Sequence, residues 1–337
     1  MITDCLKKVM TGADLSVNEM STVMDEIMEG MATPAQVGAF LVALRMKGEK
    51  IEEVAGAARA MRRHAAFIDA GPGPVIDTCG TGGDGADTFN ISTTAAFIAA
   101  GAGVTVAKHG NRGVSSKCGS ADVLAALGFN LEVTPAVMEH SIRENGIGFL
   151  FAQKMHPAMK NVGPIRRELG VRTIFNMLGP LTNPAGASGQ LLGVFSPALT
   201  EMFAGVLKEL GCRRAMVVHG ADGLDEITCT ATTRISELRD GVIKTYELFP
   251  EMVLGASYDA SEIKGGEAEF NAGILRSILD GSETGAPRAI ALLNAAAAIV
   301  VGEKADTLPD GLKLAEQALD SGAAQKKLQL LIEASHV

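Results

Sequence analysis

The sequence contains no tryptophan and only two tyrosines among its 337 residues, and aromatic side chains make up 4% of it. Platforms of stacked rings for single-stranded nucleic acid are therefore not expected. Basic residues are also scarce, because 30 lysines and arginines face 39 aspartates and glutamates and leave a net charge of -9. This balance excludes a chain-wide basic surface, so we expect neither a nucleic-acid nor a membrane partner.

Long apolar runs and paired cysteines are missing as well. The longest near-apolar stretches, residues 95–107 and 289–301, fall short of the roughly 18 to 20 residues that cross a bilayer. The first ten residues include Asp4, Lys7 and Lys8 and have no apolar run suited to a signal peptide. The five cysteines are widely spaced without a Cys-x-x-Cys pair, so neither a disulfide framework nor a zinc cluster is expected. These features predict a cytoplasmic protein with reduced thiols.

The remaining composition is that of a folded protein. Apolar residues make up 47% and charged residues 20%, which excludes a disordered chain. The length suggests about two domains, with one large domain as the alternative. The 39 glycines follow no three-residue period, so they indicate many tight turns and exclude collagen.

Helical patterns fill the first seventy residues. Apolar side chains recur at helical spacing over residues 17–28. A second helix is predicted from Thr33 to Gly48. Thr33 is a typical capping residue, because Pro34 follows it directly and Gln36 follows three residues later. A third covers residues 51 to about 64. These helices form a small helical domain or a dimerisation surface, and their pattern does not choose between the two.

The pattern changes after residues 71–74, Gly-Pro-Gly-Pro, which cannot continue a helix and form the clearest linker. Beyond it, strands and helices alternate. Strands are predicted at residues 75–77, 104–106 and 215–220, and helices at 92–100, before Gly128 and at 288–301. This alternation predicts an α/β fold with a largely parallel sheet.

The first segment with a chemical signature is residues 77–85, which read Asp-Thr-Cys-Gly-Thr-Gly-Gly-Asp-Gly. Its glycines match the dinucleotide fingerprint G-x-G-x-x-G, but no helix opens at the third glycine and no acid follows the next strand. An anion cradle is the better interpretation, because glycines let backbone N–H groups face phosphate oxygens. The helix that begins at Asn90 would add its free N–H groups, although Ser92 or Thr93 would also serve as a plain N-cap.

Two further segments carry opposite charge. Residues 108–120 gather Lys108, Arg112 and Lys117 without an intervening acid, which suits a highly phosphorylated ligand; a solvated loop is the alternative. Residues 219–226 gather three carboxylates, those of Asp222, Asp225 and Glu226, and hard oxygen ligands of this kind suit Mg²⁺ bound to a phosphate. The alternative there is an acidic turn.

A third segment, residues 156–184, is ambiguous from its composition. An arginine such as Arg166 is a natural clamp for a carboxylate, but a helix that begins near Pro164 would also carry solvent-facing arginines. His156 would equally be a packed or capping histidine.

Taken in order, these segments resemble the anthranilate phosphoribosyltransferases over nearly the whole chain. The matching stretches are Gly80-Thr-Gly-Gly-Asp84, Asn90-Ile-Ser-Thr93, Lys108-His-Gly-Asn-Arg112 with Ser115-Ser116, Gly119-Ser-Ala-Asp122, His156-Pro-Ala-Met-Lys160, Arg166, Asn176-Met-Leu-Gly-Pro-Leu-Thr-Asn-Pro184 and Asp222-Gly-Leu-Asp-Glu226. One departure is Cys118, where a serine is more often expected.

The resemblance implies transfer of the phosphoribosyl group of phosphoribosyl pyrophosphate to the amine of anthranilate, a step of tryptophan biosynthesis, with Mg²⁺ as cofactor. It implies no catalytic acid or base, with Lys108 assisting the departure of pyrophosphate. The residues implied to bind phosphoribosyl pyrophosphate are Gly80, Gly83, Asp84, Thr88, Asn90, Ile91, Ser92, Thr93, Lys108, His109, Gly110, Asn111, Arg112, Gly113, Val114, Ser115, Ser116 and Ser120. Those implied to line the anthranilate site are Gly80, Asn111, Arg166, His109, His156 and Pro180, and those implied to hold metal are Ser92, Asp225 and Glu226.

The resemblance also implies an architecture like that of the nucleoside phosphorylases. Residues 1–72 would form a smaller all-helical domain joined by residues 163–182, and residues 73–337 an α/β domain that binds phosphoribosyl pyrophosphate. Proteins of this kind usually form homodimers through their helical domains.

Three alternatives remain. A pyrimidine nucleoside phosphorylase would share the architecture and a related glycine loop, but the string Lys-His-Gly-Asn-Arg at residues 108–112 is not expected there. A nucleic-acid-binding relative should be basic on one face, whereas this chain is acidic and keeps Asp225 and Glu226. The third alternative is a structural module whose glycine loops only turn the chain.

Overall fold

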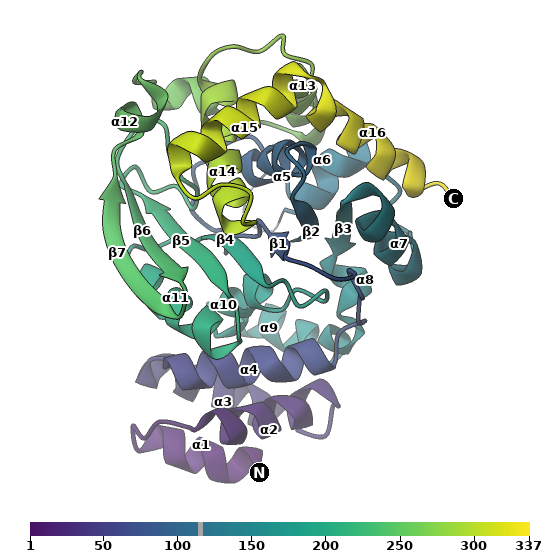
Figure 1. Ribbon diagram of the computed structural model, residues 1–337. Coiled ribbons are helices and arrows are strands. Elements are labelled where there is room, and N and C mark those ends of the chain that lie inside the picture. The colour runs from purple at the N-terminus through teal and green to yellow at the C-terminus, as the bar shows by residue number, and fades with distance from the viewer. Residues whose placement is uncertain (114–116) are drawn as a thin grey trace.

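The computed structural model describes residues 1–113 and 117–337, so the predicted ligand-binding residues Val114, Ser115 and Ser116 lie outside the described residues. The chain begins with four helices, which form the lowest layer in Figure 1: α1 (Ile2–Met10), α2 (Val17–Met28), α3 (Pro34–Lys47) and α4 (Ile51–Arg63). The three predicted helices are confirmed, including the capping box at the start of α3. Helix α1 was not predicted.

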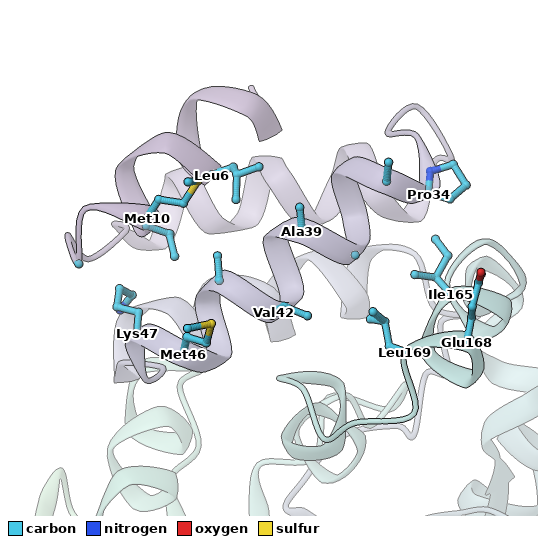
Figure 2. Close-up of a pocket in the computed structure, with 15 residues that line it drawn as sticks. Leu6, Met10, Pro34, Ala39, Val42, Met46, Lys47, Ile165, Glu168 and Leu169 are labelled. Atoms are coloured by element: carbon cyan, nitrogen blue, oxygen red, sulfur yellow. The ribbon is translucent and has the colours of Figure 1, made fainter.

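An apolar groove of about 1060 Å³ runs along the outer face of this layer, between α1, α3 and α9 (Gly163–Leu169). Figure 2 shows Leu6, Val42 and Leu169 among the side chains that line it. Met10 and Met46, at one end, are 72% and 84% exposed. Exposed apolar surfaces of this size are typical of sites where proteins contact other molecules.

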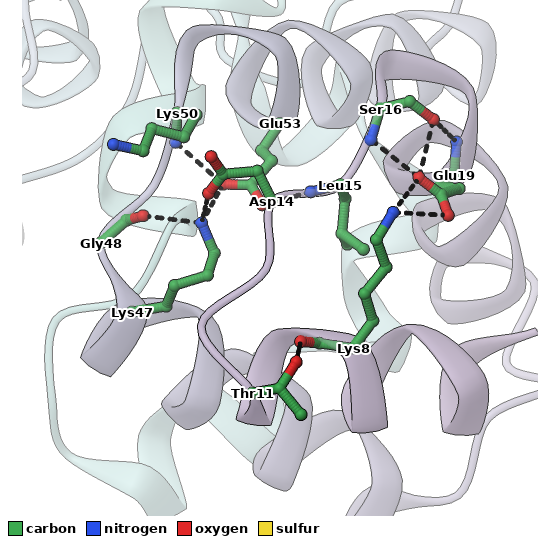
Figure 3. A network of polar contacts seen from close by, with 10 residues as sticks. All are labelled: Lys8, Thr11, Asp14, Leu15, Ser16, Glu19, Lys47, Gly48, Lys50 and Glu53. Atoms are coloured by element: carbon green, nitrogen blue, oxygen red, sulfur yellow. Dashed lines mark hydrogen bonds and ion pairs between the residues drawn. The ribbon is translucent and has the colours of Figure 1, made fainter.

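A buried carboxylate fixes the turn between α3 and α4 (Figure 3). Glu53 has no exposed surface, and Lys47 Nζ donates to its Oε2 at 2.9 Å. The backbone N–H groups of Leu15 and Lys50 also donate to the Glu53 carboxylate, at 2.9 and 2.8 Å. Because a buried charge is stable only when paired and hydrogen-bonded, this cluster ties the loop after α1 to the turn before α4.

A single seven-stranded sheet forms the centre of the molecule, in the order β3-β2-β1-β4-β5-β6-β7. The strands are β1 (Val75–Asp77), β2 (Thr105–Gly110), β3 (Ile147–Phe151), β4 (Gly189–Gly193), β5 (Arg214–Gly220), β6 (Thr233–Arg239) and β7 (Val242–Leu248). The first five strands in this order pair in parallel, which confirms the predicted fold class. Strands β6 and β7 are antiparallel additions at one edge, joined at Asp240 and Gly241.

Helices cover both faces of the sheet. In Figure 1, α5 (Ile91–Gly101), α14 (Ala286–Val301), α15 (Leu308–Asp320) and α16 (Ala323–Ala334) lie above it, and α11 (Leu199–Glu209) lies below it, against α4. The remaining helices and turns are α6 (Ser120–Ala126), α7 (Pro135–Asn145), α8 (Ala152–Met155), η1 (Pro157–Asn161), α10 (Phe175–Leu178), η2 (Gly179–Leu181), α12 (Pro250–Leu254), η3 (Ala260–Ile263) and α13 (Ala268–Leu279). Among the described helices, none has the length and apolarity needed to cross a membrane.

Two hydrophobic cores lie on opposite sides of the sheet. The upper core joins α5 and α14 to β1, β2 and β3. The lower core runs from the N-terminal helices through Ile165, Phe175 and α11 to Leu192 and Val217 in the sheet. The lower core is continuous from the helical layer to the sheet, so it marks no boundary at residue 72. The predicted division into two domains there stays a prediction.

Candidate active site

The order of the strands determines where the cleft lies. The chain moves from β1 outward to β2 and β3, and then returns to the other side of β1 as β4. Such a switch point leaves a crevice beyond the carboxyl ends of the strands, which is where open α/β sheets bind ligands. Here the crevice is a cleft of about 500 Å³, lined by the segments after β1, β2 and β5, by the start of α5, and by residues 166–180.

The structure brings nearly all predicted site residues to this cleft. Those that line it are Gly80, Gly83, Asp84, Thr88, Asn90, Ile91, Ser92, Thr93, Lys108, His109, Gly110, Asn111, Arg112, Gly113, Ser120, Arg166, Pro180, Asp225 and Glu226. His156 stands behind His109 and does not line the cleft itself.

The glycine loop after β1 is held open by close backbone contacts. Gly82 and Gly83 have φ angles of 64° and 84°, which non-glycine residues rarely adopt. Gly82 N donates to Asp225 Oδ2 at 2.7 Å, and Thr81 N donates to Gly193 O at 2.8 Å. A side chain at Gly193 would lie 1.4 Å from the Asp225 carbonyl oxygen, so the loop after β5 is able to approach only because β4 ends in glycine.

The N-terminus of α5 adds donors for an anion. Asn90 is the N-cap, but its side chain does not accept a hydrogen bond from the first turn. Thr93 is 1% exposed, and its Oγ1 has no hydrogen-bond partner among the described residues. The helix dipole and this unsatisfied hydroxyl together favour a phosphate oxygen at this end of the helix, although Ile91 N already donates to Phe89 O and Ser92 N to Glu226 Oε1.

Lys108 lies in strand β2, which continues through Gly110, so the basic loop begins later than the sequence predicts. The side chain is only 4% exposed, and Nζ donates to Thr78 O at 3.3 Å, to Thr78 Oγ1 at 3.2 Å and to Ser92 Oγ at 3.4 Å. Lys108 is therefore a buried cation at the floor of the cleft, and the alternative of a solvated loop charge does not hold for this residue.

Arg112, by contrast, is exposed and already paired. Its Nη1 donates to Asp122 Oδ1 at 2.9 Å. Asp122 Oδ2 also accepts from Gly113 N at 2.8 Å and from Gly119 N at 2.9 Å. These bonds lower the pKa of Asp122 despite its partial burial. Asp122 therefore closes the base of the loop that starts at Asn111.

The three acids of residues 219–226 separate into two groups. Asp222 turns away from the cleft, because its Oδ2 accepts from the hydroxyls of Thr228 and Thr230 at 2.6 and 2.5 Å. Asp225 and Glu226 face the cleft, and Glu226 Oε1 accepts from Ser92 N at 3.2 Å. The predicted interpretation of these residues as one acidic cluster therefore does not hold for Asp222.

Asp225 and Glu226 are half-buried and lie near Asp84. Removal from water, together with repulsion between these like charges, raises the pKa of both Asp225 and Glu226. Carboxylates that repel one another beside a serine hydroxyl form the hard oxygen donor set that Mg²⁺ prefers. Asp84, Ser92, Asp225 and Glu226 therefore fit a divalent cation.

The opposite wall of the cleft is cationic and aromatic. Arg166, from α9, lies with its Cζ 5.3 Å from the centre of the Phe175 ring. Arg172 lies with its Cζ 4.6 Å from the ring of Phe195, and its Nη2 donates to Gly83 O at 3.4 Å. Arg172, Phe175 and Phe195 line the cleft although the sequence did not single them out. The signal available was the run of arginines before a short aromatic segment.

Two buried histidines meet behind this wall. His109 Nδ1 lies 3.1 Å from Gly179 O, so Nδ1 carries the proton and donates. His109 Nε2, 3.2 Å from His156 Nε2, must then accept from His156. Burial is the main reason that the pKa of His109 falls to about 3 and that of His156 to about 4. Both rings are neutral near pH 7, which suits a pocket for an aromatic ligand.

Asp77, Cys79 and His109 also place three potential metal ligands within 4.8 Å of one another. Asp77 already accepts from His109 N at 3.1 Å and from Asn183 Nδ2 at 2.8 Å. Burial raises the pKa of the Cys79 thiol far above its ordinary value, so this side chain is a neutral thiol in the folded chain near pH 7. This cluster is a structural support of the cleft.

Comparison with known proteins places this geometry in a family. Residues 3–65 match the glycosyl transferase family, helical bundle domain, and residues 72–325 match the glycosyl transferase family, a/b domain. The anthranilate phosphoribosyltransferase of Syntrophobacter fumaroxidans is 56% identical over 332 residues, which cover 98% of each chain.

Solved structures agree with the sequence matches. The enzyme of that name from Thermus thermophilus superposes with a TM-score of 0.94 at 43% identity, covering 99% of this chain and 100% of the other. The one from Saccharomyces cerevisiae, in complex with PRPP and Mg, has a TM-score of 0.90 at 28% identity, covering 99% and 98%. The chain therefore belongs to the anthranilate phosphoribosyltransferase family.

Proposed function

We propose that this chain transfers the phosphoribosyl group of phosphoribosyl pyrophosphate to the amine of anthranilate in tryptophan biosynthesis. The amine nitrogen forms a bond to the anomeric carbon of the ribose, the bond from that carbon to the pyrophosphate oxygen breaks, and the amine loses one proton. The products are N-(5-phosphoribosyl)anthranilate and pyrophosphate. The observation that carries the proposal is a two-sided cleft, with anion-binding loops and acids on one wall and arginine, aromatic and neutral histidine side chains on the other.

The phosphoribosyl side of the cleft would be formed by the glycine loop, the start of α5 and Lys108. Phosphate oxygens would accept from backbone N–H groups of the loop and of the helix N-terminus, and Thr93 Oγ1 would gain its missing partner. Support also comes from the yeast relative, which was solved in complex with PRPP and Mg.

Mg²⁺ would be held by Ser92, Asp225 and Glu226, with Asp84 close by. When bound there, it supplies positive charge to the pyrophosphate oxygens. Lys108 Nζ, beside Ser92, is a second positive charge at the same floor, and it would stabilise the pyrophosphate as the bond to the ribose breaks.

The anthranilate side would be formed by Arg166, Pro180 and His109, with Asn111 and Gly80 at the junction of the two walls. A guanidinium held against Phe175 is oriented for two hydrogen bonds to a carboxylate. His156 would act through His109, whose ring it fixes. A yeast relative was solved in complex with 4-fluoroanthranilate, which supports an aromatic amine as acceptor.

Among the described residues that line the cleft, no pair of side chains is suited to general acid–base chemistry next to the acceptor. An aromatic amine is uncharged near pH 7 and attacks without prior deprotonation. The rate would therefore come from holding the amine and the anomeric carbon together and from stabilising the leaving group.

The proposal is tested by following the fluorescence of anthranilate. We expect the signal to decay only when enzyme, phosphoribosyl pyrophosphate and Mg²⁺ are all present, and EDTA to stop the decay. A constant signal in the complete mixture would refute the proposal. Phosphate-dependent cleavage of a pyrimidine nucleoside, measured in parallel, would instead favour a nucleoside phosphorylase.

We further propose that the chain forms a homodimer through the groove between α1, α3 and α9 (Figure 2). The groove is lined mainly by apolar side chains, and Met10 and Met46 extend into solvent at its end. A second copy that presents the same face would cover these side chains, which is the usual arrangement of a two-fold interface.

The oligomeric state tests this part of the proposal. We expect light scattering to give the mass of a dimer, and the double variant Met10→Glu, Met46→Glu to give that of a monomer. Met252→Glu is the matched control, since Met252 is 80% exposed on α12, outside the groove. A monomeric wild-type chain would contradict the proposal.

The cellular location stays a prediction. None of the five cysteines forms a disulfide within the described chain, in keeping with the reduced thiols expected from the sequence. Cytoplasmic location and the lack of nucleic-acid and membrane partners are the expectations that follow from composition alone.

A further inference from the structure

Residues 264–271, which precede and begin α13, lie across residues 86–90 and are not among the residues that line the cleft. We refer to residues 264–271 as the strap. Lys264 forms an antiparallel bridge with Thr88, and its Nζ donates to Ala86 O at 2.7 Å. Gly265 N donates to Asp87 O at 2.8 Å. The strap therefore binds three consecutive residues of the segment that joins the glycine loop to α5.

The approach of the two backbones requires a glycine. A Cβ at Gly265 would lie 2.5 Å from Phe89 N and 2.6 Å from the carbonyl carbon and oxygen of Thr88. These are backbone atoms, so no side-chain rotation relieves the clash. Any larger residue would push the strap away from the segment that carries Thr88 and Asn90.

Asn271 connects the strap to Asn90. It is 1% exposed, its Oδ1 accepts from Gly266 N at 2.7 Å, and its Nδ2 donates to Asn90 Oδ1 at 3.1 Å. The amide of Asn90 is thereby oriented, and its Nδ2 donates to Cys118 O at 3.2 Å. One side chain of α13 thus links the strap, the N-cap of α5 and the loop that follows β2.

The glycine loop is held at Thr81 and Gly82, whose N–H groups donate to Gly193 O and Asp225 Oδ2, but its solvent-facing side gains nothing from side-chain packing. Gly82 and Gly85 are exposed, and a Cβ at either would meet open space. Fixing the backbone of such residues costs conformational entropy, which ligand binding must offset unless the protein has ordered the loop beforehand.

We infer that the strap is a positioning element for the phosphoribosyl pyrophosphate site, and that Asn271 is the positioning residue for Asn90. This inference rests on the proposed function. The strap orders one end of the ligand-binding segment before the ligand arrives, while no hydrogen bond or ion pair among the described residues joins it to residues 166–180, which form the anthranilate wall.

The test separates positioning from stability. Asn271→Asp keeps the acceptor for Gly266 N but replaces the donor to Asn90 with an oxygen, so we expect the KM for phosphoribosyl pyrophosphate to rise about tenfold. The KM for anthranilate should stay within about twofold of wild type. Lys264→Met, a change at an exposed side chain, should raise the first KM by about threefold.

Asn161→Ala is the matched control, because it removes a hydrogen bond from Asn161 Nδ2 to Met28 O within the helical layer. It should lower the melting temperature without changing the KM for phosphoribosyl pyrophosphate. The inference would be overturned if Asn271→Asp changed both KM values equally. It would also be overturned if Lys264→Met left the KM for phosphoribosyl pyrophosphate unchanged.

Calorimetric binding of phosphoribosyl pyrophosphate with Mg²⁺, without anthranilate, makes the inference independent of turnover. Weaker binding by Asn271→Asp supports the positioning role of the strap, even if the wild-type chain transfers the phosphoribosyl group to a substrate other than anthranilate. If the wild-type chain binds and the variants bind equally well, the inference about the strap is wrong and the proposed function stands. If the wild-type chain does not bind phosphoribosyl pyrophosphate, both the inference and the proposed function are wrong.

Discussion

At the scale of single residues, the cleft combines charges that are costly to the folded chain. Lys108 is buried and bonded, whereas Asp225 and Glu226 face each other's charge. Residues of this kind are expected at functional sites, where stability is given up for chemistry. Two predictions belong to this scale.

The first prediction concerns Arg166. If its guanidinium clamps the carboxylate of anthranilate, Arg166→Ala should raise the KM for anthranilate about 10- to 100-fold, as expected for the loss of charged hydrogen bonds. The KM for phosphoribosyl pyrophosphate should change little. Arg167→Ala is the control, since Arg167 is its exposed neighbour in α9 and does not line the cleft. An unchanged KM for anthranilate would remove Arg166 from the site.

The second prediction concerns the acidic pair. Folding raises the pKa of both carboxyls, so their charged forms destabilise the folded chain, and this cost is present above the folded-state pKa values. The double variant Asp225→Asn, Glu226→Gln should therefore melt at a higher temperature than wild type at pH 8.5 without Mg²⁺. It should also lose Mg²⁺-dependent turnover.

Asp222→Asn provides the comparison from the same turn. It weakens the acceptor of the Thr228 and Thr230 hydroxyls, so it should lower the melting temperature and leave the Mg²⁺ dependence of turnover as it is. If both variants affected Mg²⁺ dependence alike, the separation of Asp222 from the metal site would be wrong.

At the scale of elements, local signals made most of the fold predictable. The capping box at Thr33 and the apolar periodicity of α2 and α4 identified three helices, and each is present. The missed helix α1 buries Ile2, Cys5 and Val9, which recur at the i, i+3 and i+7 spacing of a helix, so the sequence did carry a signal for it.

The antiparallel hairpin of β6 and β7 was predictable in principle. Asp240 and Gly241 both have positive φ angles, 52° and 75°, which is the backbone of the turn that Asp-Gly favours between alternating strands. The burial of β6 alternates in part, and β7 is mostly exposed, as expected at a sheet edge.

The site was less predictable than the elements, because its contacts join distant segments. Glycine-rich and charged motifs identified the loops after β1, β2 and β5. Nothing local distinguishes Asp222 from Asp225, since their different directions follow from partners met in the fold, the hydroxyls of Thr228 and Thr230 for Asp222 and Gly82 N for Asp225. Asn271 was missed for the same reason: its partner Asn90 is far away in the sequence and is met only in the folded chain.

At the scale of the whole molecule, the buried histidine pair couples stability to pH. An unfolded histidine binds a proton below about pH 6.5, whereas His109 and His156 do so in the folded chain only near pH 3 and 4. Between about pH 4 and 6.5 the unfolded state therefore binds more protons, and stability falls as the pH falls, by up to about 1.4 kcal/mol per pH unit for each histidine. Above pH 6.5 this pair adds no pH dependence.

Asp77 has the opposite effect on the pH dependence of stability. The contribution of the histidines is therefore measured as a difference between a variant and the wild type. Burial raises its pKa to about 6, so its folded form holds a proton that the unfolded form releases between about pH 4 and 6. Our prediction therefore concerns the difference in the pH dependence of unfolding free energy between the wild type and His156→Gln. In urea unfolding at pH 5, 6 and 7.5, the variant should show a shallower loss of stability on acidification, because one neutral buried histidine has been removed. Parallel pH profiles for the two proteins would show that His156 is not held neutral by the fold. A shallower profile for the variant would show that the fold keeps His156 neutral and loses stability in acid as a result. A neutral wall of this kind suits an aromatic amine.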